Sequence, residues 1–483
     1  MAVDEIRRVV VVGGGIAGLA AAHRLGQARR QGAPVDEHLV EAGDQLGGVI
    51  RTELVDGCVV EAGPDSFLGE KPEAAALARE LGLGGSLMGS NDAGRRTYIL
   101  HKGRLERLPE GLMLLAPARL GPVLTTPLLP VAGKISILRE WLMGRAPGGP
   151  PPGDDESIAS FIGRHFGPGM LENIAEPLLA GVYGGDSASL SVRSVLGRFV
   201  EMEKKFGSLT RGAMTARKCR ANAGSTFMTL QNGLGSLVEA LAGEIGSERV
   251  EFGCRAAGVE IVPSAERRYR ILLQGGSSRE ADSVILALPA WASASLLRNL
   301  DRSLSEQLAA IPYTSALTVA LAYDGQVRSR LPQGFGFLIP RAENRSLLAC
   351  TFVHAKFDHR APDDRALLRC FLGGSRDLRI LEASDEEVLS TVREELQSIL
   401  GLEAPPLFSR IYRWPRAMAQ YVVGHGERLR VITGRLREYP GLYLAGNAYQ
   451  GIGISDAIRT GEAAARQALE HQAPVAPDQV GAR

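Results

Sequence analysis

Three glycines and one glutamate near the start of the chain have the spacing of a phosphate-binding turn. Gly13, Gly15 and Gly18 follow an apolar, β-branched run at residues 6–12 and precede an Ala-rich helical segment. Glycines with this spacing permit a tight turn, close approach of the backbone to a pyrophosphate, and packing of the helix on the strand. Glu41 ends the next short strand, where a carboxylate accepts hydrogen bonds from a ribose. The pattern predicts a dinucleotide site, and a glutamate at this position argues against a 2′-phosphate.

Two further turns indicate which dinucleotide binds. The pattern E-A-x(4)-G-G occupies residues 41–48, and EAGPDSF occupies residues 61–67. Together with GGGIAGLAAA at residues 13–22, these segments resemble the amine oxidase-type flavoproteins. The resemblance implies FAD, held by an N-terminal βαβ unit to which the end of the chain returns.

The segment GNAYQGIGISD at residues 446–456 provides that return. It lies between a short apolar run and a long Ala-rich helical segment. Backbone N–H groups at the start of this helix would stabilise negative charge on a reduced flavin. No cysteine lies near the segment, so we expect FAD to be held non-covalently.

Within this superfamily the chain resembles the oxygen-dependent porphyrinogen oxidases of haem biosynthesis over nearly its whole length. Seven segments carry the resemblance in order: GPDSFL, RRTYILHKGRLERLPEGL, AEPLLAGVYGGDSASLSVRS, EKKFGSL, GFGFLIP, RWPRAMAQYVVGH and GNAYQGIGISD. The implied fold class is α/β (α+β overall). It comprises a dinucleotide-binding FAD domain, a substrate domain with a mixed sheet, and a helical domain that faces the membrane.

The expected domains are discontinuous along the chain. Residues 1–90, 225–300 and 430–472 are assigned to the FAD domain, and residues 91–224 to the helical, membrane-facing domain. Residues 301–429 form the substrate-binding domain, in which strand-like runs recur and a helix is expected at 385–400. Residues 473–483 are expected to be a disordered tail.

The resemblance also implies site residues. The cofactor contacts carried over are Gly13, Gly15, Ile16, Ala17, Gly18, Glu41, Ala42, Gly47, Gly48, Gly63, Pro64, Asp65, Ser66, Ala256, Trp414, Gly446, Ile452, Gly453 and Ile454. Arg96 matches an arginine that faces a propionate of the tetrapyrrole, Gly181 a glycine lining the substrate cavity, and Leu338 an apolar wall residue. The alternatives are an exposed charge for Arg96 and simple packing for Trp414, Gly181 and Leu338. One departure is Val49 after the Gly47-Gly48 pair, where many relatives have arginine.

No catalytic side chain is assigned. The eight histidines are scattered, and no spacing links them to carboxylates. Asp65 is the nearest candidate for a base, and the residues suggest no metal site. The resemblance implies that flavin N5 takes a hydride from an electron-rich ring, so that positioning and exclusion of water suffice.

The implied reaction is oxidation of a porphyrinogen to the porphyrin, with six electrons passing to three O2 and giving three H2O2. The run LLACTFVHAKFDHRAPDD favours the bacterial branch acting on coproporphyrinogen III, through the extra polar residues Lys356, His359 and Arg360. Protoporphyrinogen IX stays open. An amine or carotenoid oxidase would not explain AGVYGGDSASLSVRS, and a non-enzymatic prenyl-protein escort factor would not need intact flavin turns.

Composition limits the partners and the compartment. The chain has 483 residues, 45% of them hydrophobic, and a formal net charge of +1, which argues against nucleic acid. Five cysteines without a C-x-x-C pair indicate reduced thiols in a cytoplasmic protein. The apolar stretch 111–133 contains four prolines and Arg119, so a spanning helix is not expected.

The surroundings of that stretch leave two interpretations open. Residues 91–145 carry a net charge of +5, which is typical either of a solvated face or of a surface for peripheral contact with the inner face of the membrane. The resemblance favours membrane contact. A homodimer also stays open, because the sequence does not fix the oligomeric state.

Overall fold

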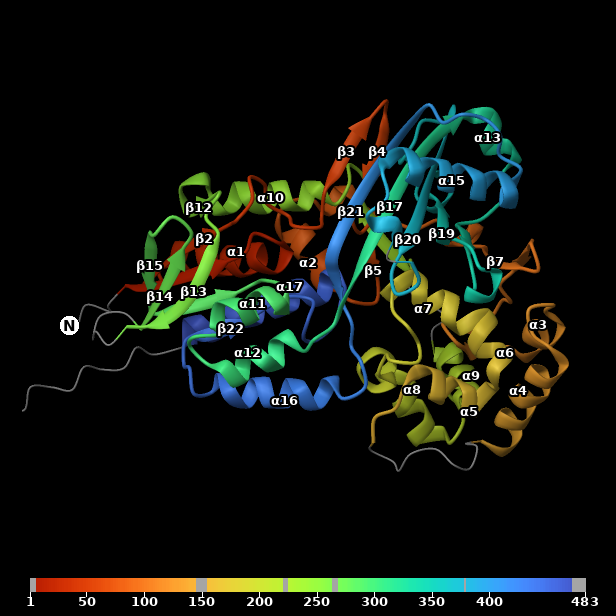
Figure 1. The fold of residues 1–483 in the computed structure, drawn as a ribbon, viewed down its shortest axis with the longest axis horizontal. Helices are drawn as coiled ribbons and strands as arrows, with labels where there is room; N and C mark the ends of the chain where they lie inside the picture. Colours follow the sequence, from red (N-terminus) through yellow and green to blue (C-terminus); the bar gives the residue numbers. More distant parts are fainter. Residues whose placement is uncertain (1–5, 145–153, 220–224, 263–267, 378, 471–483) are drawn as a thin grey trace, which may run out of the picture.

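The computed structural model describes residues 6–144, 154–219, 225–262, 268–377 and 379–470. The expected tail at 473–483 and the Gly/Pro-rich segment at 146–153 lie outside the described residues. Figure 1 shows a parallel sheet with its helices on the left, a second sheet at the upper right and a group of helices at the lower right.

The first sheet is parallel throughout and takes its strands from distant parts of the chain. Its order is β12-β2-β1-β16-β22. The β1 residues 9–12 are buried, as expected for a parallel strand covered on both faces. The strands are β1 (Arg7–Val12), β2 (Val35–Val40), β12 (Val250–Glu251), β16 (Ser283–Leu286) and β22 (Leu442–Leu444).

Each face of this sheet has its own cover (Figure 1). One apolar core holds the sheet against α1 (Ile16–Arg30), α2 (Glu73–Glu80), α10 (Gly235–Ile245) and α17 (Ile454–Glu470). The opposite core includes the antiparallel strands β13 (Ala256–Ile261), β14 (Tyr269–Leu273) and β15 (Ser278–Ala281). It also includes the helices α11 (Ala290–Leu297), α12 (Arg302–Ala309) and α16 (His425–Leu436). The doubly covered sheet leaves the carboxyl ends of its strands for a ligand.

The second sheet is mixed, as the sequence predicted. Its order is β21-β17-β20-β19-β18-β7-β8, and only the β18–β7 pair is parallel. The strands are β21 (Phe408–Ala419), β17 (Tyr313–Asp324), β20 (Arg365–Gly373), β19 (Leu347–Phe352), β18 (Gly336–Leu338), β7 (Thr97–His101) and β8 (Arg104–Arg107). Helix α15 (Asp385–Leu400) covers one face through Val388, Val392 and Leu396.

Smaller elements join the two sheets. The hairpin of β3 (Thr52–Val55) and β4 (Cys58–Glu61) leads into the segment 62–66. A three-stranded sheet follows, with β5 (Phe67–Leu68), β11 (Phe227–Leu230) and β6 (Leu87–Gly89). The short helices α13 (Gly325–Arg330) and α14 (Val353–Lys356) flank the seven-stranded sheet.

The helical part has a separate apolar core. Its helices are α3 (Leu120–Thr125), α4 (Val131–Met143), α5 (Ile158–Phe166), α6 (Pro168–Met170), α7 (Glu176–Tyr183), α8 (Val192–Phe206) and α9 (Leu209–Cys219). Pro127 and Pro130 separate α3 from α4, and no described helix is long and apolar enough to cross a membrane. One detail differs from the expected domains: β7 and β8 extend the seven-stranded sheet, because residues 97–99 continue its hydrogen-bond ladder beside β18.

Candidate active site

The glycine-rich turn between β1 and α1 leaves open space beside Gly15. Gly13 has a φ of 105°, and a Cβ added to Gly18 would lie 1.9 Å from the Gly13 oxygen, so both positions require glycine. A Cβ added to Gly15, at the start of α1, would meet no atom within 4 Å. The open space therefore lies in front of a helix N-terminus, where phosphate binding is expected.

Glu41 is fixed beside this turn by two backbone donors. Its Oε2 accepts a hydrogen bond from the Gly14 N–H at 2.7 Å, and its Oε1 accepts one from Gly43 at 2.7 Å. The Cys254 N–H donates to the Glu41 carbonyl oxygen at 2.9 Å, which brings the segment leading to Ala256 alongside. Ala42, Glu41 and Ala256 thus lie on the side of the turn predicted to hold the ribose and adenine.

Two further turns stack on the first. The Gly47 N–H donates to the Gly14 oxygen at 2.8 Å, and a Cβ on Gly48 would lie 3.4 Å from the Gly15 Cα. A Cβ on Gly63 would lie 1.8 Å from the Val49 oxygen. The structure therefore brings together the turns at residues 13–18, 47–48 and 62–66. Val49, the departure noted in the sequence, lies beside Gly63.

The turn at residues 62–66 is held from the seven-stranded sheet. The indole N–H of Trp414 donates to the Ala62 oxygen at 2.9 Å, and the Thr318 hydroxyl donates to the same oxygen at 2.8 Å. The Arg369 guanidinium donates to the Gly63 oxygen. Trp414 therefore has a defined polar contact beyond packing, at the turn that carries the predicted residues Gly63, Pro64, Asp65 and Ser66.

Asp65 is an ionised, paired carboxylate. The Lys356 ammonium lies 2.9 Å from its Oδ2 and 3.0 Å from its Oδ1, and donates to the Ser66 hydroxyl at 3.2 Å. Burial alone would raise the pKa of Asp65, but the charges of Lys356 and Arg369 outweigh it and hold the pKa well below its usual range. A carboxylate with so low a pKa is a poor proton acceptor, so Asp65 is not assigned as a base.

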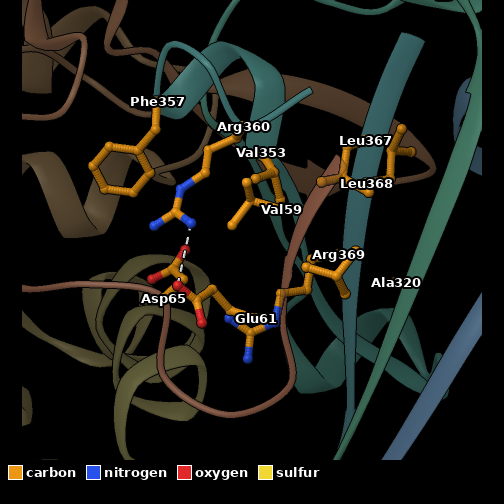
Figure 2. Close-up of a pocket in the computed structure, with 11 residues that line it drawn as sticks. Val59, Glu61, Asp65, Ala320, Val353, Phe357, Arg360, Leu367, Leu368 and Arg369 are labelled. Atoms are coloured by element: carbon orange, nitrogen blue, oxygen red, sulfur yellow. Dashed lines mark ion pairs between the residues drawn. The ribbon is translucent and has the colours of Figure 1, made fainter. Parts of the chain in front are cut away.

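A second buried ion pair, between Arg360 and Glu61, lies beside Asp65 (Figure 2). Arg360 and Glu61 have side chains that are 1% and 4% exposed, and their charged groups approach to 3.2 Å. Lys356 therefore pairs with Asp65, and Arg360 pairs with Glu61. Of the three polar residues singled out in the sequence, Lys356 and Arg360 are buried and His359 is exposed. Sequence reasoning missed Arg369, although a single arginine inside the apolar run ALLRCFL was an available signal.

The C-terminal turn brings a second helix N-terminus to the site. Gly446 and Gly451 have φ values of 125° and 120°. Asp456 accepts a hydrogen bond from Gly453 at 3.3 Å and from Lys71 at 2.5 Å, which ties the start of α17 to the segment before α2. The predicted residues Ile452, Gly453 and Ile454 lie at this junction, and Ile454 is buried in the core shared with α1.

The three predicted substrate residues lie on neighbouring segments, in α7, in β18 and just before β7. A Cβ on Gly181 in α7 would lie 3.1 Å from Leu338 Cδ2 in β18. Arg96 directly precedes β7, whose Thr97 pairs with Gly336 in β18. The Arg96 guanidinium donates to the Gln333 side chain at 2.8 Å and is partly exposed. The fold therefore places an arginine, a glycine and a leucine on neighbouring segments of the sheet and α7.

Other groups in the described residues carry no further chemistry of this kind. Cys58, Cys254, Cys350 and Cys370 are free thiols. No group of His, Cys, Asp and Glu in the part of the chain that the structure describes could hold a metal ion.

The family model for flavin containing amine oxidoreductases matches residues 16–469. Coproporphyrinogen III oxidase of Bacillus subtilis (strain 168) is 33% identical over 477 residues, covering 97% of this chain and 99% of that protein. Chloroplastic protoporphyrinogen oxidase 1 of Arabidopsis thaliana is 29% identical over 480 residues, covering 93% and 85%. The crystal structure of a protein assigned as a protoporphyrinogen oxidase from Exiguobacterium sp. 255-15 has a TM-score of 0.85 and 31% identity, covering 96% and 99%. The superfamily inferred from the glycine turns is confirmed, and this chain belongs to the flavin containing amine oxidoreductase family.

Proposed function

We propose that this protein is an oxygen-dependent FAD oxidoreductase that converts a porphyrinogen to the porphyrin in haem biosynthesis, with coproporphyrinogen III as the favoured substrate. The observation that carries the proposal is the full-length likeness to coproporphyrinogen III oxidase of Bacillus subtilis, at 33% identity. Coproporphyrinogen III oxidases of Staphylococcus aureus and Propionibacterium freudenreichii also match, at 29% and 32% identity.

FAD held at this site would supply a hydride acceptor that O2 reoxidises to give H2O2. Three such cycles would remove six electrons, and one proton of the substrate would leave to solvent in each cycle. The chain binds and orients both partners. Gly15 and the start of α1 would hold the pyrophosphate, and Glu41 the ribose. The start of α17 presents N–H dipoles that favour negative charge. No side chain is needed as a base in this account.

Substrate orientation is assigned to Arg96, Gly181 and Leu338. The apolar macrocycle of a porphyrinogen would bury against Leu338 and the exposed surface at Gly181, but apolar contact does not fix its rotation. A guanidinium binds a carboxylate through two parallel hydrogen bonds. Arg96 would therefore fix one propionate, and with it the meso carbon that faces the flavin.

The test is anaerobic reduction of the bound flavin by each porphyrinogen, in which the loss of the absorbance of oxidised flavin is measured over time. Coproporphyrinogen III is expected to reduce the flavin faster than protoporphyrinogen IX. The reverse order would assign the protein to the alternative substrate. No reduction by either, in a yellow protein that releases FAD on denaturation, would exclude a porphyrinogen oxidase.

We also propose peripheral contact with the inner face of the membrane through α4. Its exposed stripe contains Val131, Ile135, Leu142 and Met143, which are 73%, 59%, 66% and 77% exposed. Lys134 and Arg139 flank the stripe, while Gly133, Ile137 and Glu140 face the helical core. Apolar residues exposed beside basic ones suit an anionic lipid surface.

Vesicle sedimentation with and without anionic lipid tests this contact. Val131→Ser with Ile135→Ser should weaken binding at every salt concentration. Lys134→Gln with Arg139→Gln should weaken vesicle binding at low salt only, because at ~0.1–0.15 M salt the attraction between these charges and anionic lipid is already screened beyond ~8–10 Å. A wild-type protein that stays in the supernatant at low salt would contradict the proposal.

A further inference from the structure

Tyr421 holds the C-terminal glycine turn at two points. Its hydroxyl donates a hydrogen bond to the Asn447 oxygen at 2.8 Å and accepts one from the Gly451 N–H at 2.8 Å. The side chain is buried, with 4% exposure. One phenolic oxygen therefore bridges the turn just before the start of α17.

The turn needs such a brace. Gly446 and Gly451 both have positive φ and no side chain to restrict the backbone. The Gly446 N–H donates to Thr460 at 3.0 Å, and Gly453 donates to Asp456 at 3.3 Å, but both acceptors belong to α17 itself. Tyr421 fixes the turn from a different part of the chain.

The environment of Tyr421 favours this role. The His425 ring stacks on the tyrosine ring with centroids 4.1 Å apart and an angle of 10°. Burial lowers the pKa of His425 to about 4, so the stacked ring is neutral near pH 7. Burial also raises the pKa of Tyr421, so the hydroxyl keeps the proton that it donates to Asn447.

The same segment is bonded to the helical part of the protein. The Ser191 N–H donates to the backbone carbonyl oxygen of Tyr421 at 2.8 Å, and the Val423 N–H donates to the backbone carbonyl oxygen of Ser189 at 2.9 Å. Asp155 accepts hydrogen bonds from the Ser191 hydroxyl at 2.8 Å and from the Gly424 N–H at 3.1 Å. Residues 421–424 therefore touch the N-terminus of α8 on one side and the glycine turn on the other.

We infer that Tyr421 is a positioning residue that aligns the start of α17 with the flavin, and that Asp155 supports this alignment from the helical part. The inference rests on the flavin-binding part of the proposed function, and it does not depend on which substrate is oxidised. Helix N–H dipoles stabilise reduced flavin only while they point at it. A turn released from Tyr421 loses that orientation, which lowers both FAD affinity and the reduction potential.

Tyr421→Phe tests the hydroxyl while keeping the ring on His425. In the FAD-loaded full chain, the FAD Kd should rise about three- to tenfold, the range expected for one or two hydrogen bonds. The midpoint potential, measured by equilibration with a reference dye, should fall by ~15–30 mV, because loss of the aligned N–H dipoles weakens the binding of reduced FAD three- to tenfold more than the binding of oxidised FAD. A tenfold change in this ratio of Kd values is ~30 mV for a two-electron couple. Tyr443→Phe is the matched control, because its hydroxyl donates to the Gln467 carbonyl oxygen at 3.1 Å, near the C-terminal end of α17 and away from the glycine turn.

Asp155→Ala tests the support from the helical part, with thermal unfolding recorded for each variant. A fall in potential in the same direction as for Tyr421→Phe is expected, although Asp155 does not contact the turn. If Asp155→Ala does not fold, Asp155→Asn replaces it in this test, because asparagine keeps the size of the side chain and one acceptor oxygen.

An unchanged potential and Kd in Tyr421→Phe overturn the inference. An unchanged potential in a folded Asp155 variant overturns the part assigned to Asp155. A wild type that binds FAD but fails to oxidise either porphyrinogen overturns the proposed function alone, since the shift in potential is read without substrate.

Discussion

Lys356 and Asp65 form a salt bridge inside the protein, with the ammonium 2.9 Å from Oδ2 and side chains that are 11% and 15% exposed. The ammonium also lies 4.8 Å from the Phe227 ring centroid and 5.0 Å from that of Phe357. Lys356 belongs to α14, which flanks the seven-stranded sheet, and Asp65 belongs to the turn at residues 62–66. The pair therefore joins α14 to that turn.

Removing Lys356 takes away the ammonium that contacts Asp65 and leaves this buried carboxylate with the charge of Arg369 and the hydroxyl of Ser66. Lys356→Met should lower the free energy of unfolding by about 3–5 kcal/mol, as for other broken buried pairs. The double variant with Asp65→Asn should recover part of the loss. Urea unfolding of the four proteins in the cycle gives the coupling energy. Lys204→Met, in an exposed pair with Glu201, should change stability by no more than about 0.5 kcal/mol. Additive single effects would show that the two charges do not interact.

Gly15 and Gly18 should respond differently to the same added methyl group. Gly15→Ala should keep the stability of the apoprotein within about 0.5 kcal/mol, because the methyl enters open space, yet it should lose FAD. Gly18→Ala should lose FAD and also about 1–3 kcal/mol of stability, because the methyl meets the Gly13 oxygen. Gly243→Ala in α10 is the control, with no neighbour within 4 Å. Normal FAD content in Gly15→Ala would mean that the pyrophosphate binds elsewhere.

His165 should make stability depend on pH. Its ring lies 3.3 Å from both Glu140 and Glu203, with its side chain 0% exposed. Burial opposes the charged ring, but the hydrogen bonds to the two glutamates outweigh it and raise the pKa of His165. Burial would raise the pKa of Glu203, but its hydrogen bonds with His165 and Arg164 outweigh burial and lower this pKa to about 2.

The signs follow from linkage. The stabilisation from His165 is fully present below its unfolded pKa of about 6.5 and is lost as pH rises through the higher folded value. The stabilisation from Glu203 is present above its unfolded pKa of about 4.5, and it is lost as the pH falls toward the pKa of about 2 in the folded protein. The difference in unfolding free energy between wild type and His165→Gln should therefore shrink as pH rises from 6 to 9. His359→Gln, at an exposed site, controls for loss of an imidazole. A constant difference would show that folding does not raise the pKa of His165.

Arg96 should act on substrate and not on the cofactor. Arg96→Ala should lower kcat/KM by roughly 10- to 150-fold, the equivalent of ~1.5–3 kcal/mol for hydrogen bonds to a charged group. Arg96→Lys keeps the charge but loses the planar fork, so it should recover only part. Steady-state oxidation of both porphyrinogens with matched FAD content measures the effect. Arg95→Ala is the control, because Arg95 bonds Thr226 instead. Wild-type kcat/KM in Arg96→Ala would mark Arg96 as a surface charge.

Local patterns predicted the parts of the site that depend on local backbone. The glycine turns at residues 13–18 and 446–456 and the helix at Asp385–Leu400 follow from spacing and periodicity, and the structure has them. The mixed sheet was implied by the family resemblance, and the structure has it too. The roles of the individual site residues stay predictions. The place of β7 beside β18 was not predictable, because strand pairing across more than 200 residues leaves no local pattern. The contacts of Tyr421, Arg369 and Lys356 are equally non-local.

The approach of α1 to α17 has a consequence for how the protein is made. A Cβ on Gly461 would lie 2.0 Å from the Ala17 oxygen, so the two helices touch backbone to backbone. The first βαβ unit therefore cannot cover its apolar face until residue 461 has left the ribosome. At ~5–20 residues per second, that delay is on the order of a minute. We therefore expect FAD binding to require the synthesis of α17, and a chain truncated before α17 to be isolated without flavin.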